Sequence, residues 1–301
     1  MALSEGPMSG KVCVVTGASS GIGKAASLVL AQFGAEIILV CRDKARGEAA
    51  LAEVRDVATA GTARLEIADL SSLQEVRDLA GRLASLDGLD VLINNAGLVL
   101  GDRRITADGL EYTLALNHLA PFLLTNLLRE KLAASAPARV ITVSSAAHSA
   151  ARLDLADLQL AGHFNGWRAY SNSKLANILF TTELARRLTG TGVTANCLHP
   201  GTVNTGFGRD GSRMLRFGLD LGRRFLRTPG QGADTVVYLA SSPDVEGSTG
   251  GYYVRRKLRT PSRAAQDQAT ARRLWEISAE LTGLPEASLP EASLPEASQP
   301  A

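Results

Sequence analysis

The stretch VCVVTGASSGIG, from Val12 to Gly23, is an apolar run followed by a glycine-rich turn, and the helical pattern KAASLVLAQFG comes directly after it. In a strand–turn–helix unit of this kind, backbone N–H groups and the helix dipole can hold a pyrophosphate. Gly17 permits the tight turn, Gly21 lets the backbone approach the phosphates, and Gly23 lets the helix pack on the strand. The alternative is a tight turn without a ligand. The position after a first strand and before a helix favours a dinucleotide site.

Further along the chain, short β-branched runs alternate with longer helical patterns. This alternation is typical of parallel strands joined by crossover helices. The sequence therefore predicts the α/β class: a Rossmann-type doubly wound parallel sheet of about seven strands with helices on both faces, in a single domain. Functional residues are expected at the carboxyl ends of the strands, where the strand order reverses. The runs interpreted as strands are VCVVTG, EIILVC, ARLEIA, DVLINNAG, RVITVSS, VTANCL and GYYV.

Three segments lie outside this alternation. Residues 1–10 form an N-terminal lead to a domain that spans 11–284, and an irregular, arginine-rich segment interrupts the domain around 202–230. Residues 285–301 repeat the pentapeptide LPEAS. Proline at this frequency prevents helices and sheet ladders, so the tail is predicted to be disordered.

The composition excludes some classes of protein. With 45% hydrophobic residues, the 301-residue chain can bury a core and is not disordered throughout. Its 32 basic and 30 acidic residues nearly cancel, so no nucleic-acid partner is expected. The N-terminus MALSEGPMSGK has no apolar signal core, and no stretch approaches the roughly 20 apolar residues of a membrane span. We therefore expect a cytoplasmic protein.

The cysteines and histidines lack the spacing of metal ligands. The cysteines are odd in number and far apart, so we interpret them as reduced core thiols. The histidines do not cluster in the sequence, and we interpret each as structural. No metal site is predicted. These residues are Cys13, Cys41, Cys197, His118, His148, His163 and His199.

The stretch YSNSKLAN places Tyr170 and Lys174 four positions apart inside a helical pattern. At this spacing the two side chains lie on one face of a helix, one turn apart. The spacing fits an ordinary helix, and it also fits a tyrosine whose proton a neighbouring cation makes transferable.

Five elements follow one another along the chain: TGASSGIG, NNAG at Asn94–Gly97, Asn117, the pair Ser144–Ser145, and Tyr170 with Lys174. Together and in this order they resemble the short-chain dehydrogenase/reductase family. The resemblance covers about Lys11 to Leu284 and implies an NADP-binding Rossmann-fold oxidoreductase domain with a substrate lid around 202–230. CRD, SSAAH, YSNSKLANILFTTELARRL, HPGTV, TPGQGA and ARRLWEIS look more narrowly like the retinol dehydrogenase subgroup.

The resemblance implies four catalytic residues. Tyr170 would be the acid and base of hydride transfer, because the alkoxide formed from a carbonyl must be protonated. Lys174 would lower the pKa of this phenol and hydrogen-bond the nicotinamide ribose. Ser145 would orient the carbonyl oxygen, and it is preferred to Ser144 because the family's serine is usually the last of the pair. Asn117 would hold a water that joins Lys174 to solvent.

The same resemblance implies a set of cofactor contacts. Asp69 resembles the residue that contacts adenine, Asn95 the one that lines the ribose pocket, and Val203 and Thr205 the contacts to the nicotinamide carboxamide. Asn94 and Asn95 could instead satisfy backbone groups at the strand end. The full set is Gly17, Ser19, Ser20, Gly21, Ile22, Gly23, Arg42, Asp69, Leu70, Asn95, Ala96, Gly97, Tyr170, Lys174, Val203 and Thr205.

The end of the second strand, VCRD, predicts NADP(H) as the cofactor. Cys41 stands where an NAD site usually has an acidic residue, and the Arg42 that follows suits a 2′-phosphate. Asp43 is adjacent, and Ser20 stands where many NADP-using relatives have a basic residue. A solvated charge at the strand end therefore remains an alternative for Arg42.

Residues 212–228, SRMLRFGLDLGRRFLRT, place arginines on one arc of a helical wheel and apolar residues on the wide remainder. The apolar side could line a pocket for a long hydrophobic substrate, or lie peripherally in a membrane surface. A lid helix that simply packs on the core is the third interpretation.

The leading functional prediction is an NADP-dependent reductase or dehydrogenase of lipophilic alcohols, aldehydes or ketones, with retinoid-like or long-chain carbonyl substrates. Within the family, a ketoacyl or small-polyol reductase is the alternative. From another class, the chain could be a non-catalytic regulator that senses NADP. The expected partner is a small hydrophobic substrate, and the sequence leaves an oligomer open.

Overall fold

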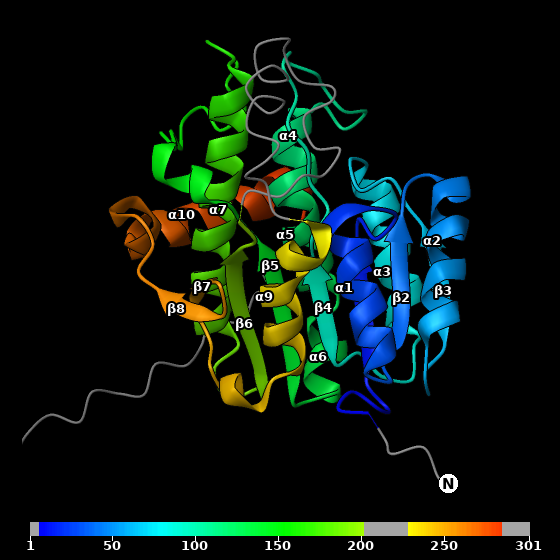
Figure 1. Ribbon diagram of the computed structural model, residues 1–301. Coiled ribbons are helices and arrows are strands. Elements are labelled where there is room, and N and C mark those ends of the chain that lie inside the picture. Colours follow the sequence, from blue (N-terminus) through cyan, green and yellow to red (C-terminus); the bar gives the residue numbers. More distant parts are fainter. Residues whose placement is uncertain (1–5, 202–227, 285–301) are drawn as a thin grey trace, which may run out of the picture.

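The computed structural model describes residues 6–201 and 228–284. They form one mixed sheet of strands in the order β3-β2-β1-β4-β5-β6-β7-β8, flanked by helices on both faces (Figure 1). The α/β, Rossmann-type prediction for a single domain is confirmed. The strands are β1 (Val12–Thr16), β2 (Glu36–Cys41), β3 (Ala63–Ile67), β4 (Val91–Asn94), β5 (Ala138–Val143), β6 (Val193–His199), β7 (Tyr252–Val254) and β8 (Lys257–Arg259).

The sheet has eight strands where the sequence predicted about seven. Strand β8 is the additional one, and it pairs antiparallel with β7 at the edge of the sheet. Arg255 and Arg256 connect the two strands with φ angles of 52° and 61°, which are uncommon for residues other than glycine, asparagine and aspartate. Arg256 is held there by an ion pair with Asp234 and by the ring of Tyr238.

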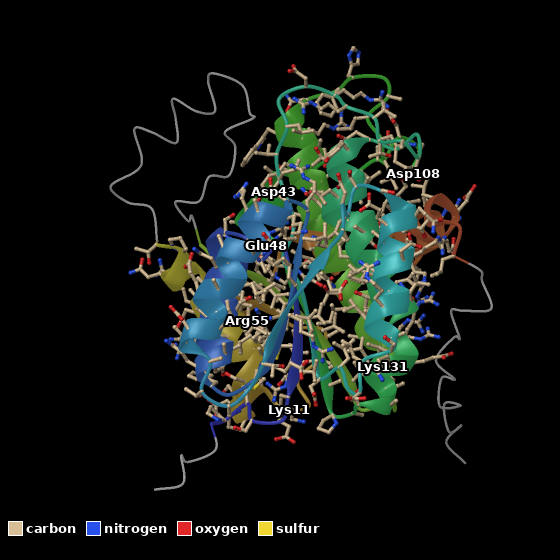
Figure 2. All side chains as sticks on the ribbon, turned by 90° about the vertical axis from the view of Figure 1, so that its right-hand side faces the viewer. Lys11, Asp43, Glu48, Arg55, Asp108 and Lys131 are labelled. Atoms are coloured by element: carbon tan, nitrogen blue, oxygen red, sulfur yellow. The ribbon has the colours of Figure 1, made fainter. Side chains whose placement is uncertain are left out.

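The order in which successive strands are added to the sheet reverses at β1. Strand β1 pairs in parallel with β2 on one side and with β4 on the other, so successive strands are added outward in both directions. Lys11, just before β1, and Asp43, just after β2, mark the two ends of the sheet in Figure 2. The carboxyl ends of β1 and β4 therefore meet at the switch point, where such sheets bind ligands.

The sheet is buried on both faces because its strands are apolar at almost every position. Val14 packs into a core cluster with α3, α5, α7 and α10, and its neighbour Val15 packs into a second cluster with α1, α2 and α9. Successive side chains of a strand point to opposite faces, which produces this division. The cysteines are free and buried, as predicted. The helices are α1 (Gly21–Gln32), α2 (Lys44–Val57), α3 (Leu73–Ala84), α5 (Ala120–Leu127), α6 (Arg129–Ala134), α7 (Gly166–Arg187), α9 (Pro229–Ser241) and α10 (Gln268–Thr282).

Shorter helical segments complete the described chain. A π-helical turn, η1, follows directly on α4 and leads into α5. No helix in the two described ranges is long and apolar enough to cross a membrane. The predictions for residues 202–227 and 285–301 concern residues outside these ranges. The short segments are α4 (Tyr112–Leu114), η1 (Ala115–Leu119), η2 (Ala146–Ala150), η4 (Pro243–Val245) and η5 (Arg263–Gln266).

Candidate active site

The predicted catalytic residues come from three elements that meet beside β5. Tyr170 and Lys174 lie one turn apart on α7, as the spacing predicts. The hydroxyl of Ser144, at the end of β5, donates to the carbonyl of Lys174 at 2.7 Å. A Cβ added to Gly97, after β4, would lie 3.4 Å from Lys174 Nζ and 3.2 Å from Asn117 Oδ1. Asn117, Lys174 and the loop after β4 are therefore close neighbours.

The ammonium of Lys174 is held inside the protein. Its side chain is buried, and Nζ donates to the carbonyl of Val143 at 2.9 Å. Burial disfavours the charged form and lowers the pKa of Lys174 to about 8. Nζ lies 5.7 Å from the centroid of the Tyr170 ring. The Lys174 ammonium thus lies near the tyrosine ring, and it loses its proton at a lower pH than an exposed lysine does.

The pKa of Tyr170 is raised, whereas the sequence prediction was a pKa lowered by Lys174. Burial of the phenol is the main cause, and a hydrogen bond from Ser145 opposes it by lowering the pKa. The difference has a physical reason: Nζ of Lys174 is bonded to the Val143 carbonyl and is itself desolvated. Burial therefore keeps the phenol of Tyr170 protonated.

The two serines at the end of β5 have different partners. Ser144 is buried and donates to Lys174, which joins β5 to α7. Ser145 is partly exposed; its Oγ accepts from the backbone N–H of Ala147 at 3.2 Å and is hydrogen-bonded to Tyr170. Since a hydroxyl has a single proton, Ser145 can donate it to the phenol or to an oxygen beside it. This geometry favours Ser145 over Ser144 for the serine role.

Asn117 lies in the π-helical turn η1, a local widening of the helix that often occurs at functional sites. Its Oδ1 accepts from the N–H of Leu98 at 2.9 Å, and its Nδ2 donates to the Leu98 carbonyl at 2.9 Å and to Ser173 Oγ at 3.0 Å. The asparagine thereby fixes the loop after β4 against α7. Its role in holding a water stays a prediction.

The glycine turn has the conformation that a phosphate cradle needs. Gly17 and Gly21 have φ angles of 67° and 59°, a region in which L side chains are strained. A Cβ on Gly23 would lie 2.6 Å from the carbonyl oxygen of Gly17. Ser20 caps α1 without a side-chain hydrogen bond, and the first turn of α1 carries no acidic residue. The N-terminus of α1 therefore fits a bound pyrophosphate.

Asn95 and Thr16 hold this turn beside the end of β4. Asn95 Nδ2 donates to the Thr16 carbonyl at 2.8 Å, and Thr16 Oγ1 accepts from the N–H groups of Asn95 and Ala96 at 3.0 and 3.1 Å. Asn94 instead donates to Thr125 at 2.9 Å. Asn95 thus satisfies a backbone group near the strand end, an alternative that the sequence left open, whereas Asn94 pairs with a side chain. Sequence reasoning missed Thr16, although its place just before the glycines was a signal.

The other predicted cofactor contacts lie around the same edge of the sheet. Ser19, Ser20 and Ile22 belong to the turn and first residues of α1, and Asp69 and Leu70 follow β3. Asp69 Oδ1 accepts from the N–H and the hydroxyl of Ser71 at 2.9 and 2.7 Å, which fixes its carboxylate. Val203 and Thr205 lie outside the described residues.

At the end of β2 an arginine side chain is exposed, and the nearby carboxylate of Asp43 is engaged as a helix cap. Burial raises the pKa of Cys41 to about 11, so this thiol is neutral at physiological pH. Arg42 is exposed and donates to the hydroxyl of Tyr112 at 3.1 Å. The carboxylate of Asp43 accepts from the N–H of Arg46 at 2.9 Å and so caps α2. Tyr112, 70 positions from Arg42, had no signal in the sequence.

The described part of the chain contains no group of three or more histidine, cysteine, aspartate or glutamate residues that could hold a metal ion. A doubly wound sheet with a glycine turn at its switch point, and with serine, tyrosine and lysine gathered beside it, defines the class of dinucleotide-binding oxidoreductases.

Comparison with known proteins gives the family. The family described as short chain dehydrogenase matches residues 11–215, and the chain belongs to this family. Human retinol dehydrogenase 11 is 44% identical over 277 residues, which cover 92% of this chain and 87% of the relative. Human retinol dehydrogenase 13 is 42% identical over 292 residues, which cover 95% and 88%. The resemblance to the retinol dehydrogenase subgroup is confirmed.

Solved structures agree with this assignment. An uncharacterized protein from Mycobacterium Paratuberculosis superposes with a TM-score of 0.75 at 35% identity, over 93% of this chain and 96% of that one. A short chain dehydrogenase from Burkholderia cenocepacia J2315, solved in complex with NADP, has a TM-score of 0.65 at 25% identity, over 87% and 100%. The chain is therefore an oxidoreductase that uses a nicotinamide cofactor.

Proposed function

We propose that the protein transfers a hydride between NADP(H) and a lipophilic alcohol, aldehyde or ketone, with Tyr170 as the acid and base. The observation that carries this proposal is the buried phenol of Tyr170, hydrogen-bonded to Ser145 and one helical turn from the ammonium of Lys174. The bound nicotinamide would supply or accept the hydride.

The chain's own groups would handle the proton and the oxygen. When a carbonyl is reduced, Tyr170 gives its proton to the oxygen, which would otherwise become an alkoxide. Ser145 donates its hydroxyl proton as a hydrogen bond to the same oxygen and orients it. The Lys174 ammonium stabilises the phenolate that Tyr170 leaves, and Asn117 keeps the loop after β4 in place.

Three features at the end of β2 support NADP over NAD. The neutral Cys41 presents no carboxylate to a ribose 2′-hydroxyl. Arg42 is exposed and can form charge-assisted hydrogen bonds with a 2′-phosphate, and Asp43 is engaged as the cap of α2. The complex of the Burkholderia cenocepacia relative with NADP points the same way. The residues that would hold the phosphates are those of the turn from Gly17 to Gly23.

The relatives support the proposed substrate class. Proteins named retinol dehydrogenase match more than nine-tenths of this chain, which favours a retinoid-like or long-chain carbonyl substrate. A ketoacyl or small-polyol reductase would use the same catalytic residues. We place the protein in the cytoplasm, with peripheral contact to membranes, where lipophilic substrates dissolve.

The test is turnover with hydrophobic and short aldehydes, with NADPH and with NADH, in the parent and in Tyr170→Phe. The variant should lose turnover by about 100-fold or more, because only the transferable proton is removed, while NADPH binding persists. A Tyr170→Phe protein that keeps most of its rate would refute the mechanism. A parent that binds NADPH and turns over no carbonyl or alcohol would favour the alternative of an NADP-sensing regulator.

A further inference from the structure

His148 is a buried histidine three residues after Ser145, in the short helix η2. It lies between two distant parts of the chain. Its Nδ1 is 2.7 Å from the carbonyl oxygen of Ser145, and its Nε2 is 3.1 Å from the backbone nitrogen of Ser262, just before η5. The ring of Tyr252, on β7, packs edge-on against the imidazole with a centroid distance of 5.1 Å and an interplanar angle of 66°.

These partners fix the tautomer of His148. The backbone N–H of Ser262 can only donate, so Nε2 must accept and carries no proton. In a neutral imidazole the proton is then on Nδ1, which donates to the carbonyl of Ser145. Burial lowers the pKa of His148 and so favours the same neutral form.

The consequence for Ser145 is that its polar atoms are clamped. Its carbonyl accepts from both the N–H and Nδ1–H of His148, at 3.2 and 2.7 Å. Its Oγ accepts from the N–H of Ala147 at 3.2 Å. The carbonyl and the hydroxyl oxygen of Ser145 both accept from groups of η2, so the hydroxyl proton is left for Tyr170, to which Ser145 is hydrogen-bonded.

We propose that His148 is a positioning residue for catalysis: through its Nδ1–H it holds the carbonyl of Ser145 and thereby aims the Ser145 hydroxyl at the reacting oxygen. This inference rests on the proposed function, in which Ser145 orients the carbonyl. Ser145 lies beyond the hydrogen-bonded ladder of β5 and β6, which ends at Val143 and Ser144, and a small misplacement of such a group costs rate. The bond to Ser262 keeps the imidazole in the orientation that this task needs.

Three variants distinguish a positioning role of His148 from a role in folding stability alone. His148→Asn places Nδ2–H near the position of Nδ1 and keeps the hydrogen bond to the Ser145 carbonyl, but it loses the hydrogen bond from the N–H of Ser262. His148→Gln reaches the position of Nε2 and keeps an acceptor for Ser262, but loses the bond to Ser145. His148→Asp is isosteric with the asparagine and sets an oxygen acceptor against the Ser145 carbonyl.

The measurements are kcat and KM for a hydrophobic aldehyde, NADPH binding by fluorescence titration, and thermal unfolding. We expect kcat to fall about tenfold or more in His148→Gln and His148→Asp, and to stay within about threefold of the parent in His148→Asn, with NADPH binding unchanged. Unfolding temperatures should fall in all three. If His148→Gln does not fold, the comparison of kcat between His148→Asn and His148→Asp tests the positioning role.

Equal kcat losses in all folded variants, or a folded His148→Gln that keeps the parent kcat, would overturn the inference. Ser145→Ala in the same assay distinguishes this failure from failure of the proposed function. If Ser145→Ala keeps its turnover, the serine has no part in the reaction and the proposed function is wrong in that respect, and the inference falls with it. If Ser145→Ala loses turnover and His148→Gln keeps it, the proposed function stands and the positioning role fails.

Discussion

Replacing Lys174 by methionine should change the pH dependence of folding stability in a way that the structure specifies. The Lys174 ammonium is buried, and burial lowers its pKa from 10.5 to about 8. Below about pH 8 both the folded and the unfolded chain carry the proton, so the full cost of burying the charge is present. Between the two pKa values the unfolded chain binds more protons than the folded one, so the stability of the parent rises with pH.

The size of the effect follows from the two pKa values. Their separation corresponds to a burial cost of about 3 kcal/mol at neutral pH, falling to about 1 kcal/mol near pH 9.5. Lys174→Met has no such titration. Its stability relative to the parent should therefore decline by about 2 kcal/mol between about pH 7 and about pH 9.5. Loss of the hydrogen bond to Val143 shifts both ends of this range alike and does not affect the slope.

Urea denaturation of the cofactor-free parent and Lys174→Met, at four or five pH values in this range, measures the difference directly. Lys44→Met, which removes an ammonium whose side chain is 77% exposed, controls for the loss of a positive charge as such. A stability of Lys174→Met relative to the parent that stays constant or rises with pH would refute the reasoning, because it would mean that the buried ammonium does not lose its proton in this window.

Three further predictions address the cofactor, the glycine turn and the membrane. In binding titrations, Arg42→Asp should weaken the binding of NADPH by a few kcal/mol and the binding of NADH much less. Equal losses for the two cofactors would show that Arg42 does not contact a 2′-phosphate. Gly23→Ala should destabilise the protein by about 1–3 kcal/mol, since its Cβ would meet the Gly17 carbonyl, whereas Gly81→Ala in α3, with no atom within 4 Å of the added Cβ, should be neutral or stabilising in thermal unfolding. The parent should co-sediment with anionic vesicles at low salt, and a variant with three apolar residues of 212–228 changed to serine should not; a parent that stays in the supernatant excludes the membrane role. Those three residues are Phe217, Leu221 and Phe225.

Most of the fold could be predicted from the sequence because its pattern is local. Seven apolar runs separated by helical patterns, with a glycine turn after the first, predict a doubly wound parallel sheet. Strand β8 could not be predicted in this way. Its three residues are all exposed and have no apolar alternation, and the Arg255–Arg256 turn lacks the glycine or asparagine that signals a hairpin. Contacts of Arg256 with Asp234 and Tyr238, distant in the sequence, hold the turn.

For the candidate site, the sequence predicted which side chains lie together but not their electrostatics. Spacing places Tyr170 and Lys174 on one helical face, and the structure has them there. Spacing cannot tell that Val143, 31 positions away, supplies the carbonyl that binds the lysine, or that burial outweighs the hydrogen bond from Ser145 and raises the pKa of Tyr170. The pKa of a buried group depends on which tertiary neighbours surround it, and these are not encoded in a single local pattern.

The polar residues of the site also determine how α7 lies on the sheet. The buried residues of α7 include many polar ones, among them Tyr170, Lys174 and Asn177, so apolar packing alone does not determine how this helix lies on the sheet. Hydrogen bonds are directional, and a buried one that loses its partner is costly. Ser144 Oγ to the Lys174 carbonyl and Lys174 Nζ to the Val143 carbonyl connect the same two elements in opposite directions. Both bonds can form in only one register, and that register is the one that sets Tyr170 beside Ser145.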